Sequence, residues 1–451
     1  MSNSKPTGKI IHGLLFSFIL VLGGVLFFIL PKDKISENEK RALTPFPKWT
    51  LESLQSGKLM DSLDLYYSDN FIFRNALIST ANELKEHYGW KDEEARIYTQ
   101  PNKPTNKTVL SGTNLPKDDA MESNANSSHA DEEDSDTPYE NIKSIIVYKS
   151  RAIQIFGGIK AALKNYAALV GRYKKELGPG VNVYCMAVPV GSDFYLPSNF
   201  SHSNEKTSIN FLYSNMDPEI KCVRAYEELE KHQSEYLQFN TDHHWTGRAA
   251  YYAYTALCNS MGSPALPMNK FTRKVIPNFV GTLYNYTMSE SLKKNKDSVE
   301  YFKIPNKTKA YYFMEGMTKS QPTSMLSERA RGGNSYGVFL GADFPLMRIV
   351  SDIKNGKKIL QIKDSYGNAF APFLPSLYEE VFVVDYRYFN GSIKELVKKY
   401  GITDVIFTHN IFVINSRYTA KREGQLLFGI REAPAVKEKK TLDSTNSEKK
   451  N

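Results

Sequence analysis

The segment from residue 240 to residue 246 holds the residue types that general base catalysis needs. Asp242 stands two residues before His244, close enough for its carboxylate to accept a hydrogen bond from the imidazole if the segment is a loop. Such a pair can take a proton from a nucleophile. The simpler interpretation is that Asp242 caps the following helix and His244 is a histidine of the core.

A serine in a second segment offers the nucleophile. The apolar run from residue 359 to residue 362 meets Asp364 and Ser365 and then a turn with Gly367. This order is typical of a buried strand whose end presents a serine at the start of a helix, although Ser365 could also be only the N-cap of that helix. A base, its orienting carboxylate and a hydroxyl at a strand end are together the parts that acyl transfer requires. We therefore expect Ser365, His244 and Asp242 to be catalytic.

These residues also carry a family resemblance. Residues 242 to 245 resemble the signature of the DHHW family, and their combination with Asp364 and Ser365 resembles that of the periplasmic alginate O-acetyltransferases. The resemblance spans about residues 37 to 430 and implies an SGNH-hydrolase-like fold. In ordinary SGNH hydrolases the serine comes first, so the order of the motifs here implies a circularly permuted arrangement.

Three further residues are candidates for contact with the reacting group. Asn410 follows a strand-like run at residues 405 to 407, and its amide and the backbone N–H of Ser365 would donate to a developing oxyanion. The SGNH pattern implies a glycine donor as well, for which Gly391 is the candidate. Both Asn410 and Gly391 could instead be ordinary turn residues. His243 is expected to support the site or to contact the substrate.

We expect neither a metal nor a cofactor. The adjacent His243 and His244 project in different directions in extended backbone, and neither has the i, i+4 partner of a helical zinc motif. Trp245 is expected in the core rather than as a platform for a sugar. The net charge of +9 favours an anionic polymer only mildly, and the basic residues do not cluster with aromatic ones, which argues against nucleic acid as a partner.

The apolar pattern predicts an α/β fold. Continuous apolar runs predict buried strands, and helical spacing between them predicts a parallel sheet flanked by helices. Thr246 is expected to cap a helix that ends near Gly262. Residues 334 to 341 are expected to form a strand and a turn beside the site. The strand-like runs lie at residues 144 to 148, 152 to 156, 181 to 189, 359 to 362, 381 to 384 and 405 to 407, and helical spacing is seen at residues 159 to 178 and 392 to 399.

The composition changes along the chain and predicts five regions. The uncharged apolar stretch at residues 11 to 30 is long enough to span a bilayer, and we interpret it as an uncleaved anchor. In the following region, Asp69 and Arg74 are expected to tie a helix end to a turn while Phe71 and Phe73 anchor it to the main body. The regions are a tail and anchor at 1–36, a brace at 37–100, a disordered acidic insertion at 101–138, the catalytic domain at 139–431 and a disordered tail at 432–451.

These features predict a membrane-anchored O-acetyltransferase whose catalytic domain lies outside the cytoplasm. A domain there has no direct supply of cytosolic acetyl-CoA, and the resemblance implies a membrane-bound O-acyltransferase as the acyl donor and a cell-surface polysaccharide as the acceptor. Simple hydrolysis by an esterase of the same fold is the alternative, since water can resolve the same acyl-enzyme. A non-catalytic polysaccharide-binding or assembly factor is the alternative from another class.

Overall fold

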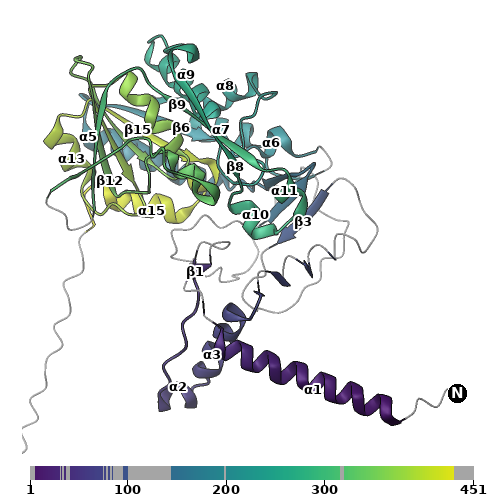
Figure 1. Cartoon of the computed structure of the whole chain (residues 1–451). Helices are drawn as coiled ribbons and strands as arrows, with labels where there is room; N and C mark the ends of the chain where they lie inside the picture. The colour runs from purple at the N-terminus through teal and green to yellow at the C-terminus, as the bar shows by residue number, and fades with distance from the viewer. Residues whose placement is uncertain are drawn as a thin grey trace, which may run out of the picture.

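The computed structural model describes residues 6–30, 32, 35–36, 41–74, 76–77, 80–81, 84, 95–99, 144–197, 200–314 and 319–430. The predicted insertion at 101–138 and the predicted tail at 432–451 lie outside these residues. Figure 1 shows a large α/β body above a smaller N-terminal part, whose first element is the long helix α1.

An eight-stranded sheet forms the centre of the body, in the order β11-β10-β12-β14-β13-β15-β6-β7. The strands from β14 to β7 run parallel, and the three strands at the other edge pair antiparallel. The strands are β6 (Asn182–Val188), β7 (Ile220–Cys222), β10 (Thr308–Phe313), β11 (Gln321–Thr323), β12 (Leu346–Ser351), β13 (Lys358–Lys363), β14 (Glu380–Asp385) and β15 (Asp404–Asn410).

The predicted parallel strands lie side by side as β14, β13, β15 and β6, and their apolar runs are buried. A wholly parallel sheet, however, is wrong, because β10, β11 and β12 extend it in the antiparallel sense. Strand β10 has only Ala310 buried, Lys309 is exposed, and its three consecutive aromatic residues are half-buried, so it lacks the continuous buried apolar run that marks the other strands.

Two groups of helices flank this sheet. Helix α5 packs with α7, α13, α14 and α15, while α9 packs with α8, α12 and η4. The predicted helix boundaries hold at α5, which ends at Gly178, and at α13, which Ser392 caps. The helices of the body are α5 (Lys160–Leu177), α6 (Ser192–Tyr195), α7 (Glu205–Ser214), α8 (Ala225–Lys231), α9 (Gly247–Met261), η2 (Met268–Lys270), η3 (Gly332–Val338), α12 (Gly367–Phe370), η4 (Ala371–Ser376), α13 (Ile393–Tyr400), α14 (Ile411–Ile414) and α15 (Arg417–Leu426).

A smaller unit packs beside the central sheet. Its three strands follow the order β3-β4-β5, and a small core joins β4 and β5 to two short helices through Ile145, Leu283 and Leu292. A separate antiparallel pair, β8 and β9, packs on η3 and α9. These elements are β3 (Ala95–Thr99), β4 (Ser144–Tyr148), β5 (Arg151–Gln154), β8 (Thr272–Phe279), α10 (Thr282–Thr287), α11 (Glu290–Lys294) and β9 (Asp297–Lys303).

The strand expected at residues 334 to 341 is wrong, because the segment begins within the 3-10 helix η3. Gly337 and Gly341 interrupt the alternation of side chains in this segment, and the Ser335 hydroxyl donates to the carbonyl of Gly332, a local bond that competes with strand pairing. The expectation that this segment lies beside the site is met by Tyr336, which stacks on His244.

The N-terminal part contains α1 (Pro6–Ile29), β1 (Ile35–Ser36), β2 (Arg41–Ala42), α2 (Leu51–Gln55) and α3 (Lys58–Asn70). Within α1, residues Ile10–Ile29 are long and apolar enough to cross a membrane, as either an anchor or a signal sequence would be. Asp69 does tie the end of α3 to Thr44, but Phe71 and Phe73 are exposed rather than anchored to the body.

Helix α9 begins directly after the loop of residues 240 to 246, and Thr246 is its N-cap residue. The Thr246 hydroxyl accepts from the N–H of Ala249 at 3.2 Å and donates to the Tyr236 carbonyl at 2.9 Å. Replacement of an N-cap threonine by alanine costs about 1 kcal/mol. We predict that Thr246→Ala lowers the free energy of unfolding by about 1 kcal/mol, measured by urea denaturation, whereas Thr246→Ser retains most of it. Equal losses in the two variants would contradict the capping role.

Candidate active site

The motif of residues 240 to 246 forms a tight loop, as expected, rather than a strand. The N–H of Phe239 donates to the His244 carbonyl, and the N–H of Thr246 donates to the Leu237 carbonyl at 2.9 Å, so the loop closes on itself. Trp245 is fully buried, in agreement with a core role. Its indole N–H donates to the Tyr366 carbonyl at 2.9 Å, which ties the loop to the serine segment.

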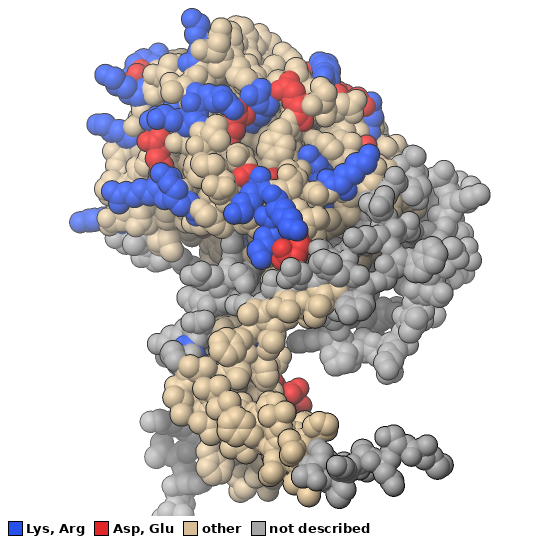
Figure 2. Space-filling model, turned by 45° about the vertical axis from the view of Figure 1, so that its right-hand side comes forward, with Lys and Arg blue, Asp and Glu red and all other residues tan. Residues whose placement is uncertain are grey.

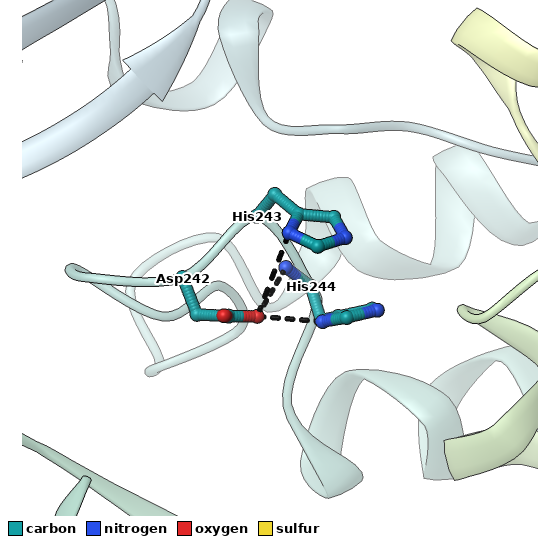
Figure 3. Close-up of side chains that lie close together, drawn as sticks. All are labelled: Asp242, His243 and His244. Carbon is teal, nitrogen blue, oxygen red and sulfur yellow. Dashed lines mark hydrogen bonds and ion pairs between the residues drawn. The ribbon is translucent and has the colours of Figure 1, made fainter. Parts of the chain in front are cut away.

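The structure brings Asp242 and His244 together (Figure 3). The His244 Nδ1 lies 2.6 Å from Asp242 Oδ1, and the backbone N–H of His244 donates to the same oxygen at 3.1 Å. The other oxygen accepts from the backbone N–H and the hydroxyl of Thr282, at 2.8 and 3.0 Å. Both oxygens of this carboxylate are therefore occupied, and His244 is assigned the tautomer with its proton on Nδ1 and its lone pair on Nε2.

The electrostatics of the loop keep Asp242 ionised. Burial opposes the charge, but the neighbouring His244 and His243 and the hydrogen bonds from His244 and Thr282 outweigh it, and they hold the pKa of Asp242 well below its usual range. An ionised Asp242 can both orient the His244 ring and stabilise the imidazolium that forms when His244 takes a proton. Capping of α9 falls to Thr246 rather than to Asp242.

A second carboxylate, Asp297 at the start of β9, holds the motif loop from the other side. It accepts the N–H groups of Asn240 and Thr241 at 2.8 and 2.7 Å, the Thr241 hydroxyl at 2.6 Å and the Tyr236 hydroxyl. Burial raises the pKa of Asp297, against the effect of these hydrogen bonds. Nothing near Asp297 in the sequence marks it as a partner of residues 240 and 241, so its role was not predicted.

Ser365 lies in the turn between β13 and α12 and is almost fully buried. The carboxylate of Asp364 shapes this turn, because Oδ1 accepts the N–H of Tyr366 at 2.8 Å and Oδ2 accepts the backbone N–H and the side-chain amide of Asn410 at 2.7 and 2.9 Å. Helix α12 begins at Gly367 with Tyr366 as its N-cap residue and without a side-chain cap. Ser365 is therefore not the N-cap of this helix.

Two tyrosines connect the serine turn to the motif loop. The Tyr336 ring stacks on His244, with centroids 3.8 Å apart and planes 12° apart, and its hydroxyl donates to the Ser365 carbonyl at 2.9 Å. The Tyr366 ring lies 5.5 Å from the His244 ring, and its hydroxyl donates to the His243 carbonyl. Tyr336 thus contacts His244 through its ring and the backbone of Ser365 through its hydroxyl, although His244 and Ser365 lie far apart in the sequence.

The other three predicted site residues, Asn410, His243 and Gly391, lie in three different environments. Asn410 is buried at the end of β15, where its side-chain oxygen accepts the N–H groups of Phe412 and Val413, so it is not an exposed turn residue. His243 packs on His244 and its Nδ1 lies 2.6 Å from the Thr282 hydroxyl. Gly391 lies exposed in the loop before α13, with its α-carbon facing the Phe389 ring. The oxyanion roles of Asn410 and Gly391 stay predictions.

Ligand atoms of Asp242, His243 and His244 lie within 4.8 Å of one another, a spacing that would admit a metal ion. Figure 3 shows, however, that the Asp242 carboxylate is engaged with His244. A cation at this place would have to displace that hydrogen bond, and with it the bond of His243 to Thr282. The donor set therefore fits a general base and its orienting carboxylate better than a metal centre.

A buried charge cluster, missed by the sequence analysis, supports the strand that carries Ser365. The Lys363 ammonium lies 2.5 Å from Asp385 and 3.3 Å from Asp343, and the Arg387 guanidinium binds the same two carboxylates at 2.7 and 3.1 Å. The neighbouring cations outweigh burial and lower the pKa of both Asp385 and Asp343. With two cations and two anions the cluster is neutral, which favours the burial of Lys363 and Asp385 within it.

Gly281 allows the carboxylate of Asp242 to approach the chain. A Cβ added at Gly281 would overlap the Asp242 side chain, whereas a Cβ added at the exposed Gly180 would meet nothing within 4 Å. Overpacking a filled interior costs about 1–3 kcal/mol. We predict that Gly281→Ala lowers the free energy of unfolding by about 1–3 kcal/mol and that Gly180→Ala leaves it nearly unchanged, as measured by thermal denaturation. Equal effects at the two sites would show that this approach is not needed.

Comparisons with known proteins agree with this fold. The family model described as "DHHW protein" matches residues 113–384. The crystal structure of a DHHW family protein from Eubacterium siraeum is 29% identical, covers 65% of this chain and 98% of that chain, and superposes with a TM-score of 0.59. PatB1 of Bacillus cereus, solved with a sulfonyl adduct, is 16% identical over 61% of this chain and 97% of that chain, with a TM-score of 0.53.

The similarity to PatB1 concerns the fold alone. The O-acetyltransferase domain of Pseudomonas putida AlgJ is also similar, at 13% identity over 62% of this chain and 95% of that domain, but its TM-score of 0.36 is too low to carry an argument. A search of curated proteins finds no match. The family model covers more than half of the 451 residues, and the motif that it is named after forms the loop that joins Asp242 to His244. The chain therefore belongs to the DHHW family.

Proposed function

We propose that this protein is an acyltransferase in which Ser365 accepts an acetyl group and passes it to a hydroxyl of a polysaccharide. The observation that carries the proposal is the buried hydrogen bond between Asp242 and the Nδ1–H of His244. It directs the basic nitrogen of His244 away from the carboxylate, and Tyr336 links that ring to the turn of Ser365. A carboxylate, an imidazole and a serine in this relation are the parts of a covalent acyl-transfer site.

In the proposed reaction His244 takes the proton of the Ser365 hydroxyl while the serine oxygen attacks the carbonyl carbon of the donor ester. His244 then gives this proton to the departing alcohol, which leaves the acetyl group on Ser365. A sugar hydroxyl next loses its proton to His244 and attacks the acetyl-serine, and the proton returns to the serine oxygen. The ionised Asp242 stabilises the imidazolium in both halves of this cycle.

The oxyanion formed at each attack needs donors with a fixed direction. Asn410 is held at both ends, because its oxygen accepts from the N–H groups of Phe412 and Val413 and its nitrogen donates to Asp364. This orientation directs the amide nitrogen towards the serine turn, which supports Asn410 as a donor. The Tyr366 N–H is bound to Asp364, so we do not assign it this role.

The proposed acetyl donor and the proposed acceptor depend on the side of the membrane on which the catalytic body lies. An apolar helix at the N-terminus supports a single membrane anchor with the body outside the cytoplasm. We propose that a membrane-bound O-acyltransferase supplies the acetyl group there, because acetyl-CoA is cytosolic. The motif resemblance to alginate O-acetyltransferases supports a polysaccharide acceptor, and a net charge of +9 is compatible with an anionic one. Figure 2 shows Lys and Arg side chains over much of the visible face of the body.

The first test concerns the nucleophile. We predict that a serine-reactive sulfonyl fluoride modifies Ser365, as located by peptide mapping, and that Ser365→Ala abolishes the adduct. His244→Ala should slow modification by about 10²-fold or more, because the base is lost. The matched controls are Ser214→Ala and His232→Ala, on α7 and at the end of α8, which should react like the wild type. An unchanged rate in Ser365→Ala would refute the proposed nucleophile, and absence of any adduct in the wild type would favour a non-catalytic binding protein.

The second test separates transfer from hydrolysis. The protein is incubated with an activated acetyl ester, with and without candidate oligosaccharides, and the products are followed by mass spectrometry. We predict an acetylated sugar that depends on Ser365, together with less free acetate when the acceptor is present, because the sugar and water compete for one acyl-enzyme. If free acetate is released at the same rate whether or not an oligosaccharide is present, for each oligosaccharide tested, the protein is an esterase instead.

A further inference from the structure

The chain after α1 forms a small unit of its own, which we call the stalk and define as residues 43–74. The Thr44 N–H and hydroxyl donate to Asp69 at 3.0 and 2.6 Å, and the Asn70 amide donates to the Thr44 carbonyl at 3.0 Å. The Phe46 ring meets the Tyr66 ring edge-on at 5.2 Å. These contacts close the segment before α2 onto the last turns of α3.

The stalk is attached to the end of α1. The Phe27 ring is buried against Tyr66 and Tyr67, with centroid distances of 6.0 and 5.2 Å. The Lys32 ammonium lies 3.6 Å from the Phe27 centroid and donates to the Asn70 carbonyl at 3.2 Å. The last turns of α3 are therefore fixed at the level of the last turn of α1.

Several large apolar side chains of the stalk are exposed. Trp49 is 76% exposed, which is unusual for a tryptophan in a soluble domain. Figure 2 shows few charged side chains on the visible surface of the N-terminal part, which includes α1, in contrast to the face of the body above it. The exposed residues include Leu51 and Leu54, three apart on α2, and Met60 and Tyr67, seven apart on one side of α3, where the exposed Asp64 lies between them.

The length of α1 fixes the height of this surface. Twenty helical residues, Ile10–Ile29, extend about 30 Å, which is the thickness of the hydrocarbon core of a bilayer. Phe27 then lies about 3 Å inside the boundary of that core. Tyr66 and Tyr67, whose ring centroids lie within 6.0 Å of that of Phe27, are therefore near this boundary. Tryptophan and tyrosine prefer this depth, and a lysine such as Lys32 extends from it to the headgroups.

We propose that the stalk binds the lipid bilayer, with the apolar face that includes Trp49, Met60 and Tyr67 inserted at the boundary between headgroups and acyl chains. This inference rests on the proposed membrane anchor. Continuity with α1 selects lipid as the occupant, because the span that crosses the bilayer brings the stalk to its surface. The contact is apolar rather than electrostatic, since the stalk has three basic and four acidic residues, and it should persist at high salt.

The test uses the full chain in phosphatidylcholine nanodiscs, with a nitroxide on single introduced cysteines. The native Cys185 and Cys258 are buried and Cys222 is replaced by serine, so the chain without an introduced cysteine serves as the blank. Labels on the stalk are placed by Trp49→Cys, Met60→Cys and Tyr67→Cys. The references are Leu20→Cys, within the apolar span, and Val275→Cys, exposed on β8 of the body.

Collision of each label with oxygen, which enters lipid, is compared with collision with a water-soluble nickel chelate. We expect a several-fold higher ratio of oxygen to nickel accessibility at the three stalk positions than at Val275, unchanged by high salt. Stalk labels that match Val275 while Leu20 is lipid-exposed would overturn the stalk proposal and leave the anchor intact. A Leu20 label in water would remove the anchor and the proposal with it. Stalk labels shielded from both reagents, or a ratio lost at high salt, would also overturn it.

Discussion

The hydrogen bond between Asp242 and His244 requires an ionised carboxylate in a buried place, and much of the surrounding structure meets that requirement. An ion of this size loses several kcal/mol of hydration free energy on burial. Each hydrogen bond to a charged group returns about 1.5–3 kcal/mol, and Asp242 accepts bonds from both His244 and Thr282. The bond is therefore stable only while the start of α10, at Gly281 and Thr282, stays in place.

The turn that contains Ser365 is likewise held by hydrogen bonds to a buried carboxylate, that of Asp364. Asp364 joins the turn after β13 to the end of β15, because it accepts from Tyr366 and from Asn410. Below this turn, Lys363 and Asp385 form a buried ion pair between β13 and β14. Three adjacent strand ends are thus connected by charged groups rather than by apolar packing. Such contacts have a defined direction, which an apolar contact lacks.

Much of the body could be predicted from the sequence because its signals are local. Continuous apolar runs predict β6, β13, β14 and β15, and the caps at Thr246, Gly178 and Ser392 predict helix ends. The pair Asp242 and His244 was also predictable, since its members are only two positions apart in the sequence. The antiparallel strands β10 and β12 were not, because each is defined by the strand it pairs with, and that strand lies far away in the sequence. Asp297 was missed for a related reason, as its partners lie far away in the sequence.

The approach of Gly281 to Asp242 has a consequence for how sequences of this kind are recognised. A chain can contain Asp-His-His by chance, but only a backbone without a side chain lets the following threonine N–H reach the aspartate. A side chain at residue 281 is therefore incompatible with this position of Asp242, although Asp242 and Thr282 lie 40 residues apart in the sequence. A search pattern that adds Gly-Thr at that distance would select sequences that can preassemble the aspartate–histidine pair, and would reject those in which the three letters of the motif have no structural meaning.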